Sequence, residues 1–240
     1  MEKLVTLVIP IYNEEDSVRE LIQQTMSLEV EFPFLSTIFV NNGSTDNTKI
    51  ELEKLSKIYS FKQLELKDNM GYGGGILEGI NSSSTKIVGW THADLQITQE
   101  SIRNSLLKIQ SLLNMNNDEF FIKGIRSGRK ISERTISYFM GLIASIIHFK
   151  KFRDINGQPT FFNKNLVNNF RDDSIPKDFN LDFYFYYIAL NNKSDIYRTK
   201  TTFIDRKYGE SKWNINIISK IRFIANTLIY IIKIKKSHEN

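Results

Sequence analysis

Three polar side chains that could bind a metal ion follow a short apolar run in the middle of the chain. His92, Asp94 and Gln96 come directly after residues 86–90, which are apolar except at the first position and typical of a buried strand. Because alternate residues of an extended segment share a face, the three side chains can point the same way. Together they offer a partial shell for Mn²⁺ or Mg²⁺. An ordinary surface turn has the same pattern, so the segment alone leaves both interpretations open.

The segments that would position these residues alternate between strand and helix. Apolar runs predict four strands, at residues 4–9, 37–40, 61–66 and 86–90. A helix is expected to begin at Asn13, which can cap it and is followed by three acidic residues. This alternation predicts a parallel sheet covered on both faces, in which ligands bind beyond the carboxyl ends of the strands. The unusual polar motifs follow these strands, at residues 12–14, 41–44, 69–75 and 92–96.

The second half of the chain is less regular. A basic loop is expected at residues 126–130 and a loop leading into a strand at 153–162. Helices are expected at 131–149 and 181–190, and a strand at 196–204. We find no repeat and no low-complexity linker. We therefore expect one domain over residues 1–213, followed by an amphipathic helix and basic tail over 214–240.

The composition limits the classes of protein. With 240 residues and 41% hydrophobic residues, the chain is typical of a globular protein. It has no cysteine, which excludes disulfides and thiolate metal sites and fits a cytoplasmic protein. A net charge of +5 favours an anionic partner. Nucleic acid is not expected as that partner, because the basic residues are not interleaved with aromatic residues in one strip.

The C-terminal segment has features of a membrane-surface helix. No stretch of the sequence reaches the roughly 20 apolar residues that cross a bilayer. Residues 215–232 carry apolar side chains at helical spacing, interrupted by Lys220 and Arg222, and lysines follow at positions 233, 235 and 236. Such a helix can lie in the interface, so we expect a peripheral protein at the inner membrane face. The same stripe could instead pack on the sheet or on another subunit, which would make a homo-oligomer.

Four motifs occur in order along the chain, at residues 8–15, 39–48, 69–73 and 92–96. Their sequences are VIPIYNEE, FVNNGSTDNT, NMGYG and HADLQ. In this order and spacing they resemble the motifs of the family 2 glycosyltransferases of the GT-A fold, particularly the branch of dolichol- and polyprenyl-phosphate sugar synthases. Residues 154–159 and 206–212 are similar as well, so the resemblance covers about residues 4–213. It implies a GT-A-like, Rossmann-type α/β/α sandwich with a mostly parallel central sheet and a C-terminal helical appendage.

The resemblance also implies an activity and the residues for it. A sugar would move from a UDP- or GDP-sugar donor to a lipid-linked or cell-envelope glycan acceptor, while a divalent cation assists departure of the nucleotide diphosphate. Asp94 would hold this cation together with His92 and Gln96. The nucleotide would be bound by Pro10, Tyr12, Glu14, Asn41, Asn69, Gly71 and Gly73.

The resemblance leaves two classes of acceptor, and each would need different residues for catalysis or binding. Asp182 would be the catalytic base for a hydroxyl acceptor, or else only an acidic residue at a helix N-terminus. A lipid phosphate needs no base, because it is already an anion. It would be recruited by the basic residues Arg126, Arg129, Arg134 and Lys212.

The departures from the family pattern keep other functions open. Asn41 and Asn42 stand where the family usually has acids, and His92 replaces the first Asp of the metal motif. With one carboxylate fewer, a site for a hard cation is weaker, and His92 could equally be a hydrogen-bonding loop residue. One alternative is a sugar nucleotidyltransferase, although the first turn lacks a glycine-rich basic phosphate loop. The other is a degenerate, non-catalytic scaffold associated with the membrane.

Overall fold

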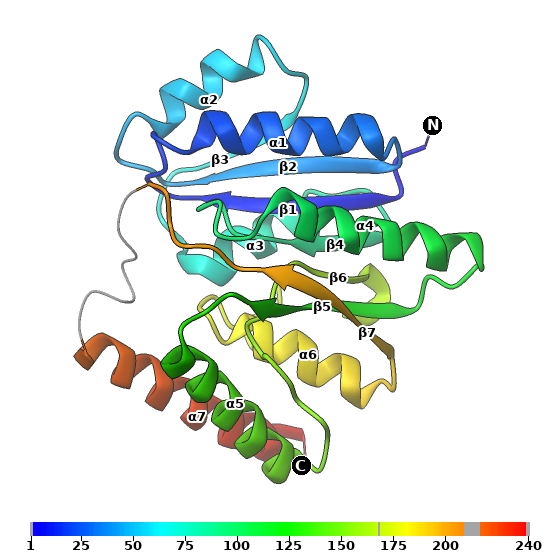
Figure 1. Cartoon of the computed structure of the whole chain (residues 1–240), viewed down its shortest axis with the longest axis vertical. Coiled ribbons are helices and arrows are strands. Elements are labelled where there is room, and N and C mark those ends of the chain that lie inside the picture. The colour runs from blue at the N-terminus through cyan, green and yellow to red at the C-terminus, as the bar shows by residue number, and fades with distance from the viewer. Residues whose placement is uncertain (1, 168, 209–216, 239–240) are drawn as a thin grey trace.

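The computed structural model describes residues 2–167, 169–208 and 217–238. Within them, seven strands form one sheet in the order β3-β2-β1-β4-β6-β5-β7 (Figure 1). The strands are β1 Val5–Ile11, β2 Leu35–Asn42, β3 Lys62–Leu66, β4 Ile87–Trp90, β5 Phe120–Ser127, β6 Thr160–Asn163 and β7 Asp195–Thr202. β6 is antiparallel to its neighbours β4 and β5, whereas the other paired strands are parallel.

Helices cover both faces of the sheet. They are α1 Val18–Glu31, α2 Thr48–Ser56, α3 Gly71–Asn81, α4 Gln99–Asn114, α5 Ile131–His148, α6 Leu181–Asn191 and α7 Ile217–His238, with a short 3-10 turn at Lys164–Leu166. Successive residues of β1 alternate between two cores: Leu7 packs with α1, α2 and α4, and Val8 packs with α3 and α6. This α/β/α sandwich with a mostly parallel sheet confirms the predicted fold class.

Two local expectations were wrong. Strand β5 was not predicted, because its apolar run of Phe120, Phe121 and Ile122 ends at a lysine, Lys123, and was too short to be recognised. The first helix begins at Val18, with Ser17 at its N-cap, rather than at Asn13. Asn13 has a left-handed backbone, φ 56°, which a helix N-cap does not adopt.

The C-terminal helix α7 packs on the domain. It lies beside α5 (Figure 1), and its residues Ile231 and Ile234 are buried in the core that also contains Phe183. The predicted boundary between residues 213 and 214 falls outside the described residues. None of the described helices combines the length and the apolar character needed to span a bilayer.

A close approach between two backbone segments positions one wall of the site. A Cβ atom on Gly157 would lie 2.1 Å from the carbonyl oxygen of Gly124, on β5. The loop before β6 can therefore pack against β5 only with glycine at this position. The same loop carries Asn156, which lines the cavity described below, and Asp154, which pairs with two arginines at its wall.

We predict that Gly157→Ala lowers the free energy of unfolding by about 2 kcal/mol, because backbone atoms on both sides must move apart. Urea denaturation measures this change. Ser60→Ala, an exposed loop substitution, is the control and should change stability by less than about 0.5 kcal/mol. Equal stabilities of the two variants would contradict the predicted steric conflict.

Candidate active site

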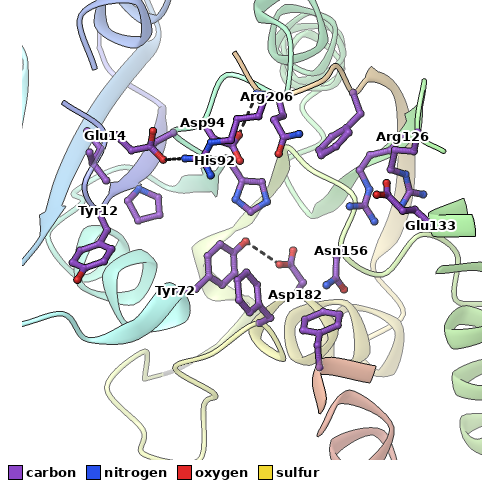
Figure 2. A pocket seen from close by; sticks show the side chains of 18 of the residues that line it. Tyr12, Glu14, Tyr72, His92, Asp94, Arg126, Glu133, Asn156, Asp182 and Arg206 are labelled. Atoms are coloured by element: carbon purple, nitrogen blue, oxygen red, sulfur yellow. Dashed lines mark hydrogen bonds and ion pairs between the residues drawn. The ribbon is translucent and has the colours of Figure 1, made fainter. Parts of the chain in front are cut away.

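A cavity of about 640 Å³ opens at the carboxyl edge of the parallel strands (Figure 2). Loops after β1, β2, β4, β5 and β7 contribute to its wall, together with α3, α5, α6 and α7. The sequence-predicted residues that line it are Pro10, Tyr12, Glu14, Asn69, His92, Asp94, Gln96, Arg126, Arg129 and Asp182. Most of the predicted site residues therefore meet in one cavity, at the sheet edge where ligands bind in this class of fold.

Hydrogen bonds between two loops fix the end of the cavity near β1 and β2. The Thr45 amide donates to Asn13 Oδ1 at 2.8 Å, and the Glu14 amide donates to Thr48 Oγ1 at 2.9 Å. The left-handed backbone of Asn13 turns its side chain toward this second loop. The segment after β2 thus holds residues 12–16 in place. In this position Tyr12 and Glu14 face the cavity.

Glu14 and Arg206 form an ion pair near Asp94 (Figure 2). Burial raises the pKa of Glu14, and this effect exceeds the opposing effects of the Arg206 guanidinium and of a 2.8 Å hydrogen bond donated by Ser17 Oγ. The Asp94 carboxylate adds repulsion that raises the same pKa. This end of the cavity therefore places Glu14 and Asp94 beside one fixed cation.

The segment after β4 has the alternation that the sequence predicts. His92, Asp94 and Gln96 are partly exposed and line the cavity, while Leu95 between them is buried. Asp94 Oδ1 accepts the Gln96 amide at 3.1 Å, and Gln96 Nε2 donates to the Ile204 carbonyl at 3.2 Å. These hydrogen bonds fix the side chains of Asp94 and Gln96 at the cavity wall.

The residues around Asp94 fit only one type of metal site. Among the described residues, no three His, Asp or Glu side chains lie close enough together to hold a metal ion. Mg²⁺ in phosphate-transfer sites is commonly held by one or two carboxylates together with substrate phosphates. Asp94 fits such a site, in which the substrate supplies the remaining oxygen ligands.

Aromatic rings form the middle of the cavity wall. The ring of Tyr72 stacks on Phe179 with centroids 4.7 Å apart, and the ring of His92 lies 5.4 Å from that of Tyr72. The imidazole of His92 thus packs beside an aromatic ring at the cavity (Figure 2). This contact accounts for the position of His92 without a metal ligand.

A buried ion pair lies beneath this wall. Lys123 Nζ, on β5, is 3.0 Å from Asp182 Oδ1, and the two side chains are 0% and 1% exposed. Tyr72 donates to Asp182 Oδ2 at 2.9 Å. Burial lowers the pKa of Lys123, although Asp182 opposes this effect, and burial together with Asp182 raises the pKa of Tyr72 well above its usual value. Lys123 was missed at the sequence level, where its signal was a single lysine within an apolar run.

The opposite end of the cavity is basic. Arg126 binds the Asp154 carboxylate through Nε at 3.1 Å, and Arg129 approaches the same carboxylate at 3.4 Å. Burial would raise the pKa of Asp154, but the Arg126 guanidinium and its hydrogen bonds hold that pKa below its usual value. Within the described part of the chain, the buried Nε of Arg129 has no hydrogen-bond partner. Glu133 lines the same end of the cavity and acts electrostatically on Arg129. Two guanidinium groups thus face the cavity here, beside the carboxylates of Asp154 and Glu133.

The remaining predicted residues are placed differently. Asn41 is fully buried and lies outside the cavity wall, because its Nδ2 donates to Glu65 at 3.0 Å and its Oδ1 accepts the Ser44 amide at 3.2 Å. Its neighbour Asn42 lines the cavity instead. Whether Asn41 contacts a nucleotide stays a prediction.

The glycines of the third motif have a structural explanation. A Cβ atom on Gly71 or Gly73 would lie 2.7 Å from a backbone carbonyl oxygen of residues 176–177. Neither glycine is part of the described cavity wall. The two glycines therefore allow the backbone of α3 to lie close to residues 176–177.

The last two predicted basic residues are not in the cavity wall. Arg134 is exposed on the first turn of α5 and is not among the described residues that line the cavity. Lys212 lies outside the described residues. The basic end of the cavity therefore rests on Arg126 and Arg129.

Sequence comparison identifies a family and two partial relatives. Residues 6–165 match the profile described as "Glycosyl transferase family 2". Over 97 residues the chain is 30% identical to the poly-beta-1,6-N-acetyl-D-glucosamine synthase of Staphylococcus epidermidis, covering 40% of this chain and 23% of that protein. Over 104 residues it is 35% identical to the undecaprenyl-phosphate 4-deoxy-4-formamido-L-arabinose transferase of Proteus mirabilis, covering 41% and 31%. The matched part is thus less than a third of either relative.

Structure comparison shows the same fold over almost the whole chain. The glucosyl-3-phosphoglycerate synthase of Mycobacterium tuberculosis, solved with Mn²⁺, UDP and glucosyl-3-phosphoglycerate, superposes with a TM-score of 0.67. The superposition covers 95% of this chain and 78% of the mycobacterial chain, at 13% identity. At this identity the similarity establishes the fold.

We predict that Lys123→Met lowers the free energy of unfolding by about 3 kcal/mol or more, because the Asp182 carboxylate loses its buried counter-ion. Lys123→Met/Asp182→Asn should recover part of the loss, since no unpaired charge then remains. The matched control is Lys86→Met, which removes the exposed ion pair with Asp118 and should cost no more than about 1 kcal/mol. The prediction fails if Lys123→Met and Lys86→Met have the same denaturation midpoint.

Proposed function

The chain belongs to glycosyl transferase family 2, and from this premise we propose that it transfers a sugar from a nucleotide-sugar donor to a lipid-linked phosphate acceptor. The observation that carries the proposal is one cavity with Glu14, Asp94 and Arg206 at one end and basic side chains at the other. The names of similar proteins support both the proposed acceptor and the proposed donor. The Proteus mirabilis relative is an undecaprenyl-phosphate sugar transferase, and the mycobacterial structure contains UDP and Mn²⁺.

The donor would occupy the end of the cavity near β1. Tyr12 offers an aromatic surface for the base, and the loop around it is held by hydrogen bonds before any ligand binds. Glu14 can accept a hydrogen bond from a hydroxyl group of the nucleotide. We propose UDP or GDP as the nucleotide and direct contacts from Pro10 and Asn69.

Negative charge develops on the diphosphate as the bond to the sugar breaks, and cationic groups must stabilise it. Arg206 lies at this end of the cavity and supplies one fixed positive charge. Asp94, with His92 and Gln96 beside it, would hold a divalent cation, which supplies Lewis-acid stabilisation of the leaving diphosphate. Dependence on Mn²⁺ or Mg²⁺ is therefore part of the proposal.

The acceptor phosphate would bind at the basic end of the cavity. Arg126 and Arg129 present two guanidinium groups to the cavity, positioned by the carboxylate of Asp154, and guanidinium groups bind phosphate oxygens through charge-assisted hydrogen bonds. Arg134 and Lys212 are proposed as additional contacts to the same acceptor. A phosphate oxygen is already an anion, so its attack on the sugar needs no general base.

Asp182 has a different role for each class of acceptor. With a phosphate acceptor, it positions the Tyr72 ring through their hydrogen bond. With a hydroxyl acceptor of a cell-envelope glycan, it is the carboxylate in the cavity wall that could accept the proton. Lys123 fixes the position of the Asp182 carboxylate in either role through their ion pair.

We further propose that the protein works as a peripheral protein at the cytoplasmic face of a membrane, where a lipid-linked acceptor is accessible. Two other functions make different predictions in calorimetry with UDP or GDP, with and without Mn²⁺. A non-catalytic scaffold would bind neither nucleotide. A sugar nucleotidyltransferase would hydrolyse a nucleoside triphosphate.

We predict that Asp94→Asn keeps the fold but lowers turnover at least about tenfold, equal to about 1.4 kcal/mol in the barrier, because cation binding is lost. Release of free nucleotide from the sugar donor measures turnover. His92→Asp adds a carboxylate at the matched position and should tighten Mn²⁺ binding in calorimetry. Near-normal turnover of Asp94→Asn would rule out this assignment, and unchanged Mn²⁺ affinity of His92→Asp would show that residue 92 does not approach the metal.

A further inference from the structure

Helix α5 exposes a continuous apolar face. From residue 136 to residue 149, every exposed side chain is aliphatic or aromatic. The large exposed residues along the helix and at its C-cap are Ile131, Ile136, Tyr138, Phe139, Leu142, Ile146 and Phe149, with exposed fractions from 37% to 88%. Most of them recur at intervals of three, four and seven residues, so they share one side of the helix. Such a long uncovered apolar face is unusual for a soluble surface.

The opposite side of α5 is covered. Met140, Gly141, Ala144 and His148 are buried against the rest of the protein. His148 Nε2 lies 2.9 Å from the carbonyl oxygen of Ile231, on α7. The orientation of α5 is therefore fixed by packing, and the exposed face belongs to a helix that cannot rotate to bury it.

Positive charges stand at both ends of this face. Residues 130–153 contain five basic residues and one acidic residue, Glu133. Lys130 and Arg134 are exposed at the N-terminal end, and Lys151 and Arg153 are exposed just after the C-terminal end. Glu133 lines the cavity instead (Figure 2). An apolar face with basic residues at its ends matches the surface of a bilayer that contains anionic lipids.

We propose that α5 is a membrane-docking helix, whose apolar face inserts into the headgroup region of an anionic phospholipid bilayer. The inference rests on the proposed function in one respect: the docked bilayer would supply the lipid-linked acceptor. Ser132, Glu133 and Ser137 of α5 line the cavity, and Arg129 donates to Ser137 Oγ at 2.8 Å. One helix thus connects the docking face with the basic end of the cavity.

This assignment differs from the one that the sequence favoured. The sequence predicts that the amphipathic segment 215–232, which lies largely in α7, is the membrane-surface helix. In the structure, Ile231 and Ile234 of α7 are buried, while Ile221, Ile229 and Ile232 are exposed. α7 therefore supports α5 from one side, and deleting it would remove part of the core. Point substitutions on α5 are the cleaner test.

The test is flotation of the full chain with vesicles of phosphatidylcholine, with and without phosphatidylglycerol. The variant Phe139→Ser/Leu142→Ser/Ile146→Ser removes apolar groups that are exposed in the free protein, so its thermal unfolding should be unchanged. Its affinity for anionic vesicles should fall at least about tenfold, because three large apolar side chains no longer insert. The matched control Val30→Ser/Ile58→Ser/Met115→Ser changes three apolar residues outside α5 that are even more exposed and should float like the unmodified protein.

Charge is tested separately by Lys130→Gln/Lys151→Gln, which should weaken binding about fivefold per lysine near the surface. High salt should weaken the binding of the unmodified protein. Equal flotation of the α5 variant and the unmodified protein would overturn the proposal. It would also be overturned if the unmodified protein did not float and the α5 variant converted a dimer into a monomer in sedimentation, because the face would then join two copies of the chain.

Calorimetry with UDP and GDP on the same samples separates this inference from the proposed function. The α5 variant should keep the nucleotide affinity of the unmodified protein, since its changed residues lie outside the cavity wall. If nucleotide binding is absent but vesicle binding depends on α5, the proposed function fails and the docking surface stands. If nucleotide binds but vesicle binding does not depend on α5, the docking surface fails alone.

Discussion

The buried ion pair between Lys123 and Asp182 constrains the arrangement of the whole cavity. It joins β5 to α6, and the hydrogen bond from Tyr72 to the same carboxylate adds α3. A shift of β5 or α6 would leave a charge unpaired in the protein interior, which costs several kcal/mol, and a shift of α3 would break the hydrogen bond. The aromatic wall of Tyr72, Phe179 and His92 is built on this pair, so the two ends of the cavity keep a fixed separation.

The two ends present different charged groups. Near β1 and β4, the acidic side chains of Glu14 and Asp94 surround Arg206, which suits a cation and a diphosphate together. Near β5 and α5, Arg126 and Arg129 offer guanidinium groups that can bind an anion, although Asp154 and Glu133 lie beside them. A family 2 glycosyltransferase that transfers the sugar of a nucleotide-sugar to an acceptor phosphate, with release of the nucleoside diphosphate, would need both sets of groups in one cavity. Helix α5 connects the second set with the proposed membrane surface.

Local sequence patterns predicted much of the fold and of the cavity. Alternation of apolar runs with helical stretches identified β1 to β4, and the period of two placed His92, Asp94 and Gln96 on one face. Contacts between distant segments could not be predicted in the same way. Lys123 gains its role only when β5 meets α6, and Asn41 is turned from the cavity by Glu65, its partner across the β2–β3 ladder. Which apolar face of α5 or α7 stays exposed depends on how the two helices pack together.

A crystal structure of the chain with UDP or GDP and Mn²⁺ tests the central claim most directly, that one cavity at the carboxyl edge of the sheet binds a nucleotide-sugar donor. The account predicts a nucleoside diphosphate in direct contact, within about 4 Å, with Tyr12 at the nucleoside and with the residues around Asp94 and Arg206 at the diphosphate. A nucleotide bound more than about 10 Å from all of Pro10, Tyr12, Glu14 and Asn69, well beyond contact distance, would contradict it.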